Sequence, residues 1–412
     1  MQLSIIDGLH HVDRDDWNAL TSSSVLGRHP FVQYDFLKLL EDSGSVGLDD
    51  DTGQHSGWHP LHVLVHDDDG KLLGACPTYL KEHSYGEYIF DWSWANAIER
   101  MGVPYYPKIV VGIPFTPATG PRLLLHPDAD GDVVKALLAE GLKAAAAELK
   151  ASSVHVLFCL DDELAAFEDA GFFRRATHQF HWRNDQPHYD DVDAFLAQLR
   201  SQNRKQIRKE RRVVDESGLL VERVRQGALH QGDYERLFQL YRSTTDRKWG
   251  QAYLTRAFFD GLAGAGGQDA LVNTARDDDG ALVAMALSFT SEQHIYGRYW
   301  GALHADRGRR QEQLHFELCY YQLLEHAIVH GMDLVEAGAQ GEHKIKRGFL
   351  PVVTHSAHFI VEPQLHDAIG RAMNLERQEV EHEVESGRIR GPFKEGCVPP
   401  HPLRAGCVLR DS

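Results

Sequence analysis

The chain carries the same succession of hydrophobic and polar positions twice. Residues 62–76 read HVLVHDDDGKLLGAC and residues 272–286 read VNTARDDDGALVAMA, and with one inserted residue the likeness extends over 62–88 and 272–299. Apolar runs on either side of an Asp-Gly turn predict antiparallel strands joined by a tight turn. We therefore expect strand, acidic turn, strand, turn and strand in each half.

Helices flank these strands at matching places in both halves. An aromatic-rich helix is expected at 31–37 and again at 253–259, before each set of strands. After the first set, residues 132–150 are rich in helix-forming residues and precede an apolar strand at 154–158. The second half repeats this order with a long helix and then a strand at 332–336.

Each half ends on one motif, Gly-Phe-x4-Thr-His-x2-His-aromatic. The motif reads GFFRRATHQFHW at 171–182 and GFLPVVTHSAHF at 348–359, without a gap. Three matching segments in the same order indicate a duplicated module. Its two histidines lie three apart on expected strands and point to opposite faces, so they are poor joint metal ligands, and we predict no metal.

These patterns predict an α/β (α+β) chain built from two tandem copies of one module. Each copy is expected to be a mixed, mostly antiparallel sheet flanked by helices. We expect a first domain over 1–185, a second domain over 186–395 and a flexible tail over 396–412. A chain of 412 residues is long enough to bury two such cores.

Composition limits the classes of function. The net charge of −17 opposes broad binding to DNA, because the protein and the phosphates repel each other. No apolar run is long enough for a membrane span, and no secretory signal precedes the first module. Five scattered cysteines are typical of a reducing compartment, so we expect a cytoplasmic protein.

One segment departs from the acidic background. Residues 200–212 read RSQNRKQIRKERR and carry seven Lys or Arg against one Glu. A focused basic helix predicts an anion site, with Arg204, Lys205 and Arg208 as its phosphate-binding residues. A solvated helix face is the alternative interpretation.

The segment 336–349, EAGAQGEHKIKRGF, is the first candidate for a catalytic site. It begins at a strand end, and its glycines let the backbone approach a ligand. Glu336 is the candidate general base because burial at a strand end raises a carboxyl pKa, and His343 is the second candidate. The remaining polar residues are expected to bind substrate: Gln340, Lys344, Lys346 and Arg347. A polar surface loop is the alternative.

Further substrate-binding candidates lie in both halves. Arg298 and Trp300 sit in an Arg-Tyr-Trp run that suits stacking and a charge contact, at a strand end that corresponds to residues 87–88. In the first half, Lys108 and Arg122 are expected to face an acidic acceptor, with Thr116 in the same proline-rich stretch. Packing is the competing explanation for all five.

Several stretches resemble one branch of the GNAT superfamily of N-acyltransferases. Residues 167–172, FEDAGF, are similar to the close of a GNAT domain, and 199–209 and 343–349 resemble segments of Fem aminoacyl transferases. From about residue 5 to 395 the chain resembles the bacterial FemAB-like predicted N-acyltransferases, in stretches such as GEYIFD at 86–91 and AGAQGEHK at 337–344.

This resemblance implies tandem GNAT-like domains and direct transfer of an acyl or aminoacyl group to an amine, without a covalent enzyme intermediate. The acyl donor would be a co-substrate, acyl-CoA or aminoacyl-tRNA, and no covalently bound cofactor is expected. The acceptor would be a cell-wall precursor or another small amine. The glycine-rich pyrophosphate loop of acetyl-CoA-binding GNAT domains is missing at 305–312, and no heptad segment suggests the helical arm of tRNA-dependent relatives. Two alternatives stay open: acyl-CoA-dependent acylation of a small amino metabolite, and a non-catalytic module that recognises cell-wall fragments.

Overall fold

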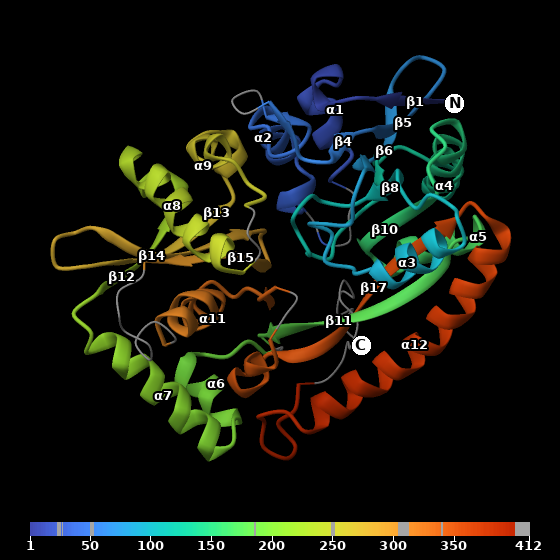
Figure 1. Cartoon of the computed structure of the whole chain (residues 1–412). Coiled ribbons are helices and arrows are strands. Elements are labelled where there is room, and N and C mark those ends of the chain that lie inside the picture. Colours follow the sequence, from blue (N-terminus) through green and yellow to red (C-terminus); the bar gives the residue numbers. More distant parts are fainter. Residues whose placement is uncertain are drawn as a thin grey trace. The chain divides into compact units, whose positions relative to one another are not determined.

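A computed structural model describes residues 1–22, 26, 28–49, 53–184, 187–248, 252–303, 313–338 and 341–399, apart from the side chains of 247 and 248. The chain forms two compact units (Figure 1). The first holds residues 1–178 and 353–384, and the second holds residues 179–352 and 385–399. Among the described residues, no helix is both long and apolar enough to cross a membrane.

The first unit is built on a sheet that Pro77 interrupts. Strands β1 (Gln2–Ile6), β5 (His62–His66) and β6 (Leu72–Cys76) pair antiparallel, and β9 (Leu124–Leu125) extends this part. Beyond Pro77 the chain continues as β7 (Thr78–Lys81), which pairs with β4 (Trp58–Pro60) and β8 (Lys108–Val111). Proline has no N–H to donate to a ladder, which explains the break. β8 then runs parallel to β10 (Ser153–Cys159).

The second unit repeats this order without the interruption. Strands β12 (Leu220–Arg225), β13 (Ala270–Arg276), β14 (Leu282–Thr290) and β15 (His294–Ala302) pair antiparallel in sequence. β15 then runs parallel to β16 (Leu334–Glu336), as β8 does to β10. The predicted duplication is thus confirmed strand by strand.

The last strand of each module joins the other unit. β11 (Phe173–Arg183) ends the first module, yet its residues 181–183 pair with β16 of the second unit. β17 (Leu350–Ile360) ends the second module, and its residues 355–360 pair with β10 of the first. The expected boundary at 185 follows the chain and misses this exchange. Most of the expected tail, residues 400–412, lies outside the described residues.

Helices cover the sheets of each unit. In the first, α4 (Gly131–Glu148) begins at Asp130, whose carboxylate accepts a hydrogen bond from the Val133 N–H, and its apolar face packs on β5, β6 and β10. α1 (Arg14–Ala19), α2 (Tyr34–Asp42), α3 (Trp92–Arg100) and α5 (Asp161–Asp169) complete this unit. The second has α6 (Val192–Gln198), α7 (Ser201–Asp215), α8 (Gln231–Lys248), α9 (Arg256–Gly261), the π-helix η5 (Glu317–Tyr321) and α11 (Gln322–Val329).

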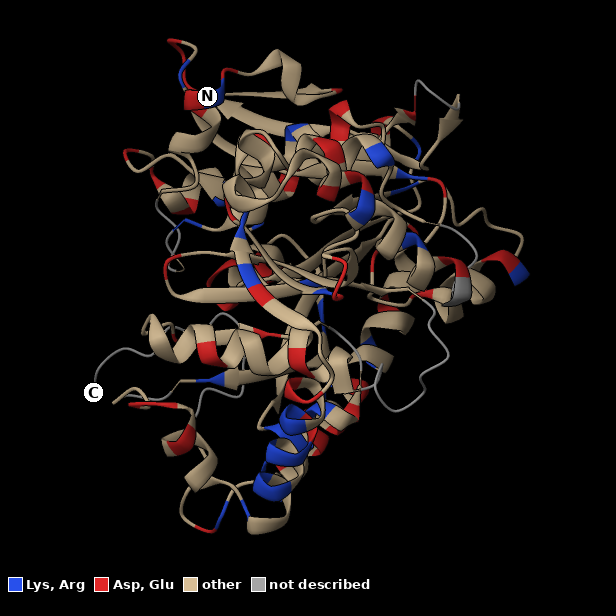
Figure 2. Ribbon diagram, turned by 90° about the vertical axis from the view of Figure 1, so that its left-hand side faces the viewer, with Lys and Arg blue, Asp and Glu red and all other residues tan. Residues whose placement is uncertain are grey.

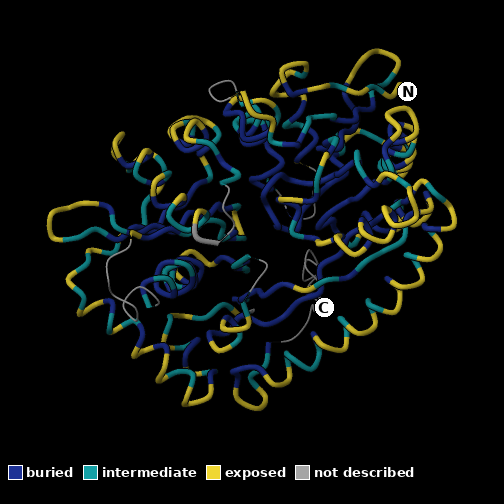
Figure 3. Tube along the Cα trace, viewed as in Figure 1, coloured by how far each residue is buried: buried dark blue, intermediate teal, exposed yellow. Residues whose placement is uncertain are grey.

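One long helix had no counterpart in the sequence predictions. α12 (Pro363–Ile389) follows β17 and begins in the first unit. Val380 and Val384 pack against Ala176 and Val353, whereas much of the helix is exposed (Figure 3). The strands of both units are mostly buried in the same view. Only a few apolar residues of α12 are buried, and its sequence therefore shows a weak periodicity of hydrophobic positions.

Candidate functional site

Glu336 ends β16 and is buried, as the sequence predicted. Its Cα faces Tyr296 of the parallel strand β15 and His181 of β11. The Nε2 atom of His181 lies 3.9 Å from Glu336 Oε2. Burial lowers the pKa of His181 to about 3, with smaller contributions from His294 and Lys344, so His181 is neutral at neutral pH.

The segment after Glu336 folds into the short 3-10 helix η6 (Glu342–Arg347). Gly348 ends it in the left-handed region with φ of 95°, and a Cβ there would lie 2.7 Å from the Phe195 ring, so glycine is required. His343 and Lys346 are exposed, whereas Lys344 and Arg347 are buried. Gln340 lies outside the described residues.

Arg347 anchors η6 to helix α7. Its Nη2 donates to Glu210 Oε1 at 2.8 Å, its Nε donates to the Tyr321 hydroxyl at 3.0 Å, and its Nη1 donates to the His343 carbonyl at 2.7 Å. The guanidinium also lies 3.4 Å from the centroid of the Phe316 ring. All three nitrogens of the Arg347 guanidinium therefore donate to protein groups.

Lys344 is a buried amine whose side chain hydrogen-bonds to a backbone carbonyl. Its Nζ donates to the Gly338 carbonyl at 2.8 Å, and the Phe180 ring lies 5.9 Å away. Burial lowers the pKa of Lys344 to about 7, although Cys319 opposes the shift slightly. A contact with substrate stays a prediction for this residue.

A cavity of about 580 Å³ in the second unit joins the two segments that the sequence singled out separately. One wall is a face of α7 and the other is η6, and the chain after α12 closes the site. The lining residues are Arg200, Gln202, Asn203, Gln206, Ile207, Glu210, Phe316, His343, Ile345, Lys346, Arg347, Arg390, Gly391 and Pro392. Backbone hydrogen bonds hold this closing segment in place, from Arg200 N–H to Pro392 and from Lys394 N–H to Gln198.

Three cations at this cavity have no acidic partner within salt-bridge distance among the described residues. They are Arg200, Lys346 and Arg390, and all three are exposed. Neighbouring arginines are paired: Arg211 with Glu317 and Glu325, and Arg388 with Glu385. In an acidic protein, unpaired cations grouped around one cavity suit a bound anion.

The three residues predicted from the basic segment lie on α7 but outside the cavity lining. Lysine and arginine gather along this helix (Figure 2). Arg208 pairs with Asp193 at 2.7 Å, Arg204 donates to the Leu199 carbonyl at 3.3 Å, and Lys205 is exposed. Residues spaced three and four apart share a helix face, so Asn203, Gln206 and Glu210 line the cavity instead.

Arg298 and Trp300 lie on β15 and do not line the cavity. The Arg298 guanidinium is 5.2 Å from the Tyr299 ring, and the Trp300 ring is 5.1 Å from His315. Their expected match to residues 87–88 is wrong, because β8 takes the place of β15 in the first unit and 87–88 form no strand.

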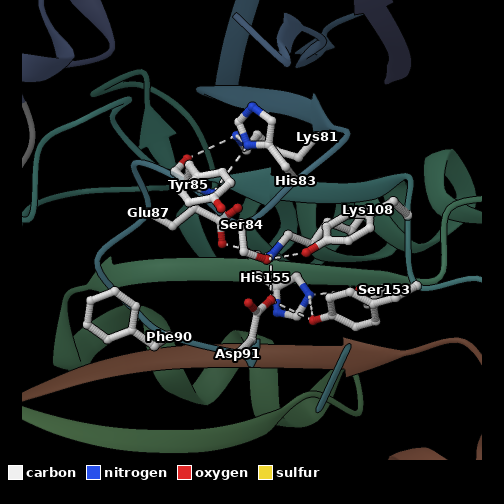
Figure 4. Close-up of polar contacts among 12 residues, drawn as sticks. Lys81, His83, Ser84, Tyr85, Glu87, Phe90, Asp91, Lys108, Ser153 and His155 are labelled. Carbon is white, nitrogen blue, oxygen red and sulfur yellow. Dashed lines mark hydrogen bonds and ion pairs between the residues drawn. The ribbon is translucent and has the colours of Figure 1, made fainter. Parts of the chain in front are cut away.

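In the first unit, Lys108 lies at the centre of a buried ionic cluster (Figure 4). Its ammonium donates to Ser84 and to Glu87, both at 2.8 Å, and pairs with Asp91. Burial opposes the charge, but Glu87 and Asp91 together raise the pKa of Lys108. Burial alone would raise the pKa of Asp91, yet Lys108 holds it well below its ordinary value. Lys108 thus faces internal carboxylates, which corrects the expectation that it faces an acceptor.

A chain of hydrogen bonds continues from Asp91 into the sheet. The Tyr105 hydroxyl donates to Asp91 at 2.6 Å and lies 3.3 Å from His155 Nε2, which is 2.7 Å from Ser153 Oγ. His155 Nδ1 meets His358 Nδ1 at 2.7 Å. Burial first, and then Lys108, lower the pKa of His155 to about 3, so the pair is neutral. By strand register, His155 and His358 occupy the places of Glu336 and His181 in the other unit.

Arg122 and Thr116 are also structural in this arrangement. Arg122 is buried and donates to the carbonyls of Leu157, Pro121 and Ala118, while Thr116 donates to the Pro114 carbonyl. The expectation that Arg122 faces an acceptor therefore does not match its position. Neither residue enters the site proposed below.

The sequence predictions missed several residues of the cavity. Arg200 opens the basic segment, and the helical spacing with buried Ile207 and Val214 identifies the inward face that holds Glu210. Tyr320 and Tyr321 do not line the cavity but hydrogen-bond to residues that do, and they fell within the long helix expected in the second half. Arg390 follows a helix that was not predicted, so no local signal marked it.

Glu87 supplies a test of the ionic cluster by pH. Burial raises the pKa of Glu87 from 4.5 to about 7, against the attraction of Lys108. The folded state then keeps a proton that the unfolded chain releases, so the free energy of unfolding should decrease as pH rises from about 4.5 to about 7. Glu87→Gln should remove this slope, a difference on the order of 3 kcal/mol across the interval.

The measurement is urea denaturation of both proteins over this pH range. Glu163 has a similarly raised pKa and affects both proteins equally, so it cancels in the difference. Glu82→Gln, at an exposed carboxyl of the same loop, is the matched control and should keep the wild-type slope. Parallel curves for wild type and Glu87→Gln would show that Glu87 does not titrate as proposed.

Comparison with known proteins completes the description. The profile of the FemAB-like family, described as peptidoglycan biosynthesis/recognition, matches residues 8–395. No match was found among curated proteins. A crystal structure of FemX is similar with a TM-score of 0.52 and 13% identity, over 90% of this chain and 100% of that chain.

Two further solved structures are similar. The C-terminal domain of a protein described as a lysylphosphatidylglycerol synthetase from Agrobacterium fabrum gives a TM-score of 0.50 at 12% identity, over 88% of this chain and 96% of that chain. A tandem GNAT protein from the clavulanic acid biosynthesis pathway gives 0.42 at 14% identity, over 88% and 99%. The predicted α/β fold is confirmed, since FemX and the Agrobacterium fabrum domain share it over most of this chain. Because the family profile spans nearly the whole sequence, the chain belongs to the FemAB-like family.

Proposed function

We propose that the protein is an N-acyltransferase that passes an acyl or aminoacyl group directly to an amine. The donor, acyl-CoA or aminoacyl-tRNA, binds with its phosphate groups in the cavity between α7 and η6. The acceptor is an amine of a peptidoglycan precursor, in keeping with the description of the family. The observation that carries the proposal is the group of three cations, Arg200, Lys346 and Arg390, which lie around one cavity without an acidic partner in the described part of the chain.

Both candidate donors carry phosphates beside a nucleoside, and fixed cations suit such groups. The cavity adds the amide side chains of Gln202, Asn203 and Gln206, which both donate and accept hydrogen bonds. Its mixed wall therefore fits a polar, phosphate-bearing group better than an apolar one.

Transfer also requires that the acceptor amine lose a proton and that the developing oxyanion be stabilised. Glu336 is the proposed base, because it is the buried carboxylate at the end of the parallel strand pair. His343 lines the cavity and is the group that reaches a bound donor. Neither role involves a covalent link to the protein.

The cavity cations give the sharpest test of donor binding. A variant with Arg200→Gln, Lys346→Gln and Arg390→Gln should bind pyrophosphate about 100-fold more weakly or worse, since each charge-assisted hydrogen bond contributes about 1.5–3 kcal/mol. Isothermal titration calorimetry at low and high salt measures the loss, and the salt dependence should flatten.

The matched control removes the same charge from the same helix outside the cavity, by Arg204→Gln, Lys205→Gln and Arg208→Gln. Pyrophosphate and CoA binding should stay within about twofold of wild type, because neither ligand reaches these side chains. A loss of aminoacyl-tRNA binding in this control would favour the RNA donor, whose phosphates extend beyond the cavity. Unchanged pyrophosphate binding in the cavity variant would remove the donor site.

Activity is assayed by mass spectrometry of a peptidoglycan precursor with a free amine, incubated with acetyl-CoA or with aminoacyl-tRNA. A new amide on the precursor is the expected product. Tight precursor binding with no transfer from either donor would favour a recognition module instead.

A further inference from the structure

Two consecutive tyrosines of the π-helix η5 hydrogen-bond to side chains of η6. The Tyr320 hydroxyl lies 2.9 Å from Nε2 of His343, and the Tyr321 hydroxyl bonds to Glu210 and to Arg347. A π-turn contains about one residue more than an α-turn, so neighbouring side chains diverge less around the axis. Both hydroxyls can therefore reach the same short helix, which an α-helical turn would hinder.

The ring and the backbone of His343 are both restrained. Its ring centroid lies 5.7 Å from that of Phe316, 5.9 Å from that of Tyr320 and 6.2 Å from that of His315. Arg347 fixes its carbonyl through a hydrogen bond of 2.7 Å. Both the ring and the carbonyl of His343 are thus held in place, as a preorganised site requires.

The direction of the tyrosine hydrogen bond follows from burial. Tyr320 is buried, and His343 Nε2 is the hydrogen-bond partner of its hydroxyl among the described residues, so a hydroxyl that accepted there would leave its own O–H buried and unsatisfied. The hydroxyl therefore donates to Nε2. A neutral imidazole has one acceptor nitrogen and one N–H. When Nε2 accepts from Tyr320, the proton of His343 resides on Nδ1.

We propose that Tyr320 is a positioning residue that fixes neutral His343 as the Nδ1–H tautomer and thereby occupies its basic nitrogen, Nε2. His343 then does not accept the proton of the acceptor amine, and proton abstraction is left to Glu336. The assignment of proton abstraction rests on the proposed function, whereas the tautomer does not.

Nitrogen NMR of the full chain, labelled with ¹⁵N-histidine, tests the tautomer without any substrate. The His343 signals are identified by their loss in His343→Gln. At neutral pH in wild type, Nδ1 should resonate in the protonated range and Nε2 in the unprotonated range. In Tyr320→Phe, which keeps the ring and removes only the hydroxyl, Nε2 should move to the protonated range or to an average of the two.

Tyr321→Phe is the matched control, since it removes the neighbouring hydroxyl and should leave the His343 signals in place. An Nε2–H form in wild type would overturn the proposal, and so would an unchanged spectrum in Tyr320→Phe. If Tyr320→Phe fails to fold, the wild-type spectrum alone decides. Absent pyrophosphate binding would count against the donor site and leave the tautomer result standing.

Discussion

Lys108→Met should destabilise the first unit by about 3–5 kcal/mol, because it leaves the Asp91 carboxylate buried without its counter-charge. Methionine matches the length of the lysine stem, so the change removes charge and hydrogen bonds more than volume. Lys108 is wholly buried, and Ser84 depends on it for a hydrogen bond as well. Urea denaturation followed by circular dichroism measures the loss.

Two comparisons separate this cause from general damage. Lys71→Met removes an exposed ion pair with Asp128 in the same unit and should cost less than about 1 kcal/mol. Adding Asp91→Asn to Lys108→Met should restore part of the stability, since the unpaired charge is then gone. A Lys108→Met protein as stable as wild type would mean that the carboxyl groups do not depend on the lysine.

The module order could be predicted from the sequence because it rests on local patterns. Apolar alternation, the Asp-Gly turns and the helix-forming run at 132–150 each determine their own element. The exchange of β11 and β17 has no such signal. The two strands carry the same motif, so either could complete either sheet, and the choice depends on partners distant in sequence.

The site was predictable in its parts and not in its assembly. The basic residues of α7 and the glycines and charged residues around η6 each singled out their own segment in the sequence. Only the folded structure shows that the two segments meet, with Glu210 Oε1 2.8 Å from Arg347 Nη2. Lys108 was misread because its partners, Glu87 and Asp91, lie in an irregular loop without periodicity. A buried cation and a substrate-binding cation look alike in sequence when their carboxylates cannot be placed.

Glu336→Gln should lower turnover about 100- to 10,000-fold, with little change in donor affinity, if Glu336 is the general base. The amide keeps the shape of the carboxylate but cannot accept the amine proton. Arg347 pairs with Glu210, and Lys344 donates to the Gly338 carbonyl. The competing explanation for Glu336 is a structural contact with His181, whose Nε2 lies 3.9 Å from Glu336 Oε2. If the Glu336–His181 contact is structural, Glu336→Gln and His181→Gln should lose thermal stability alike. If Glu336 is the general base, the Glu336→Gln protein should be stable, and its pH–rate profile should lack the acid limb. A stable variant with near-normal turnover would exclude Glu336 from the chemistry.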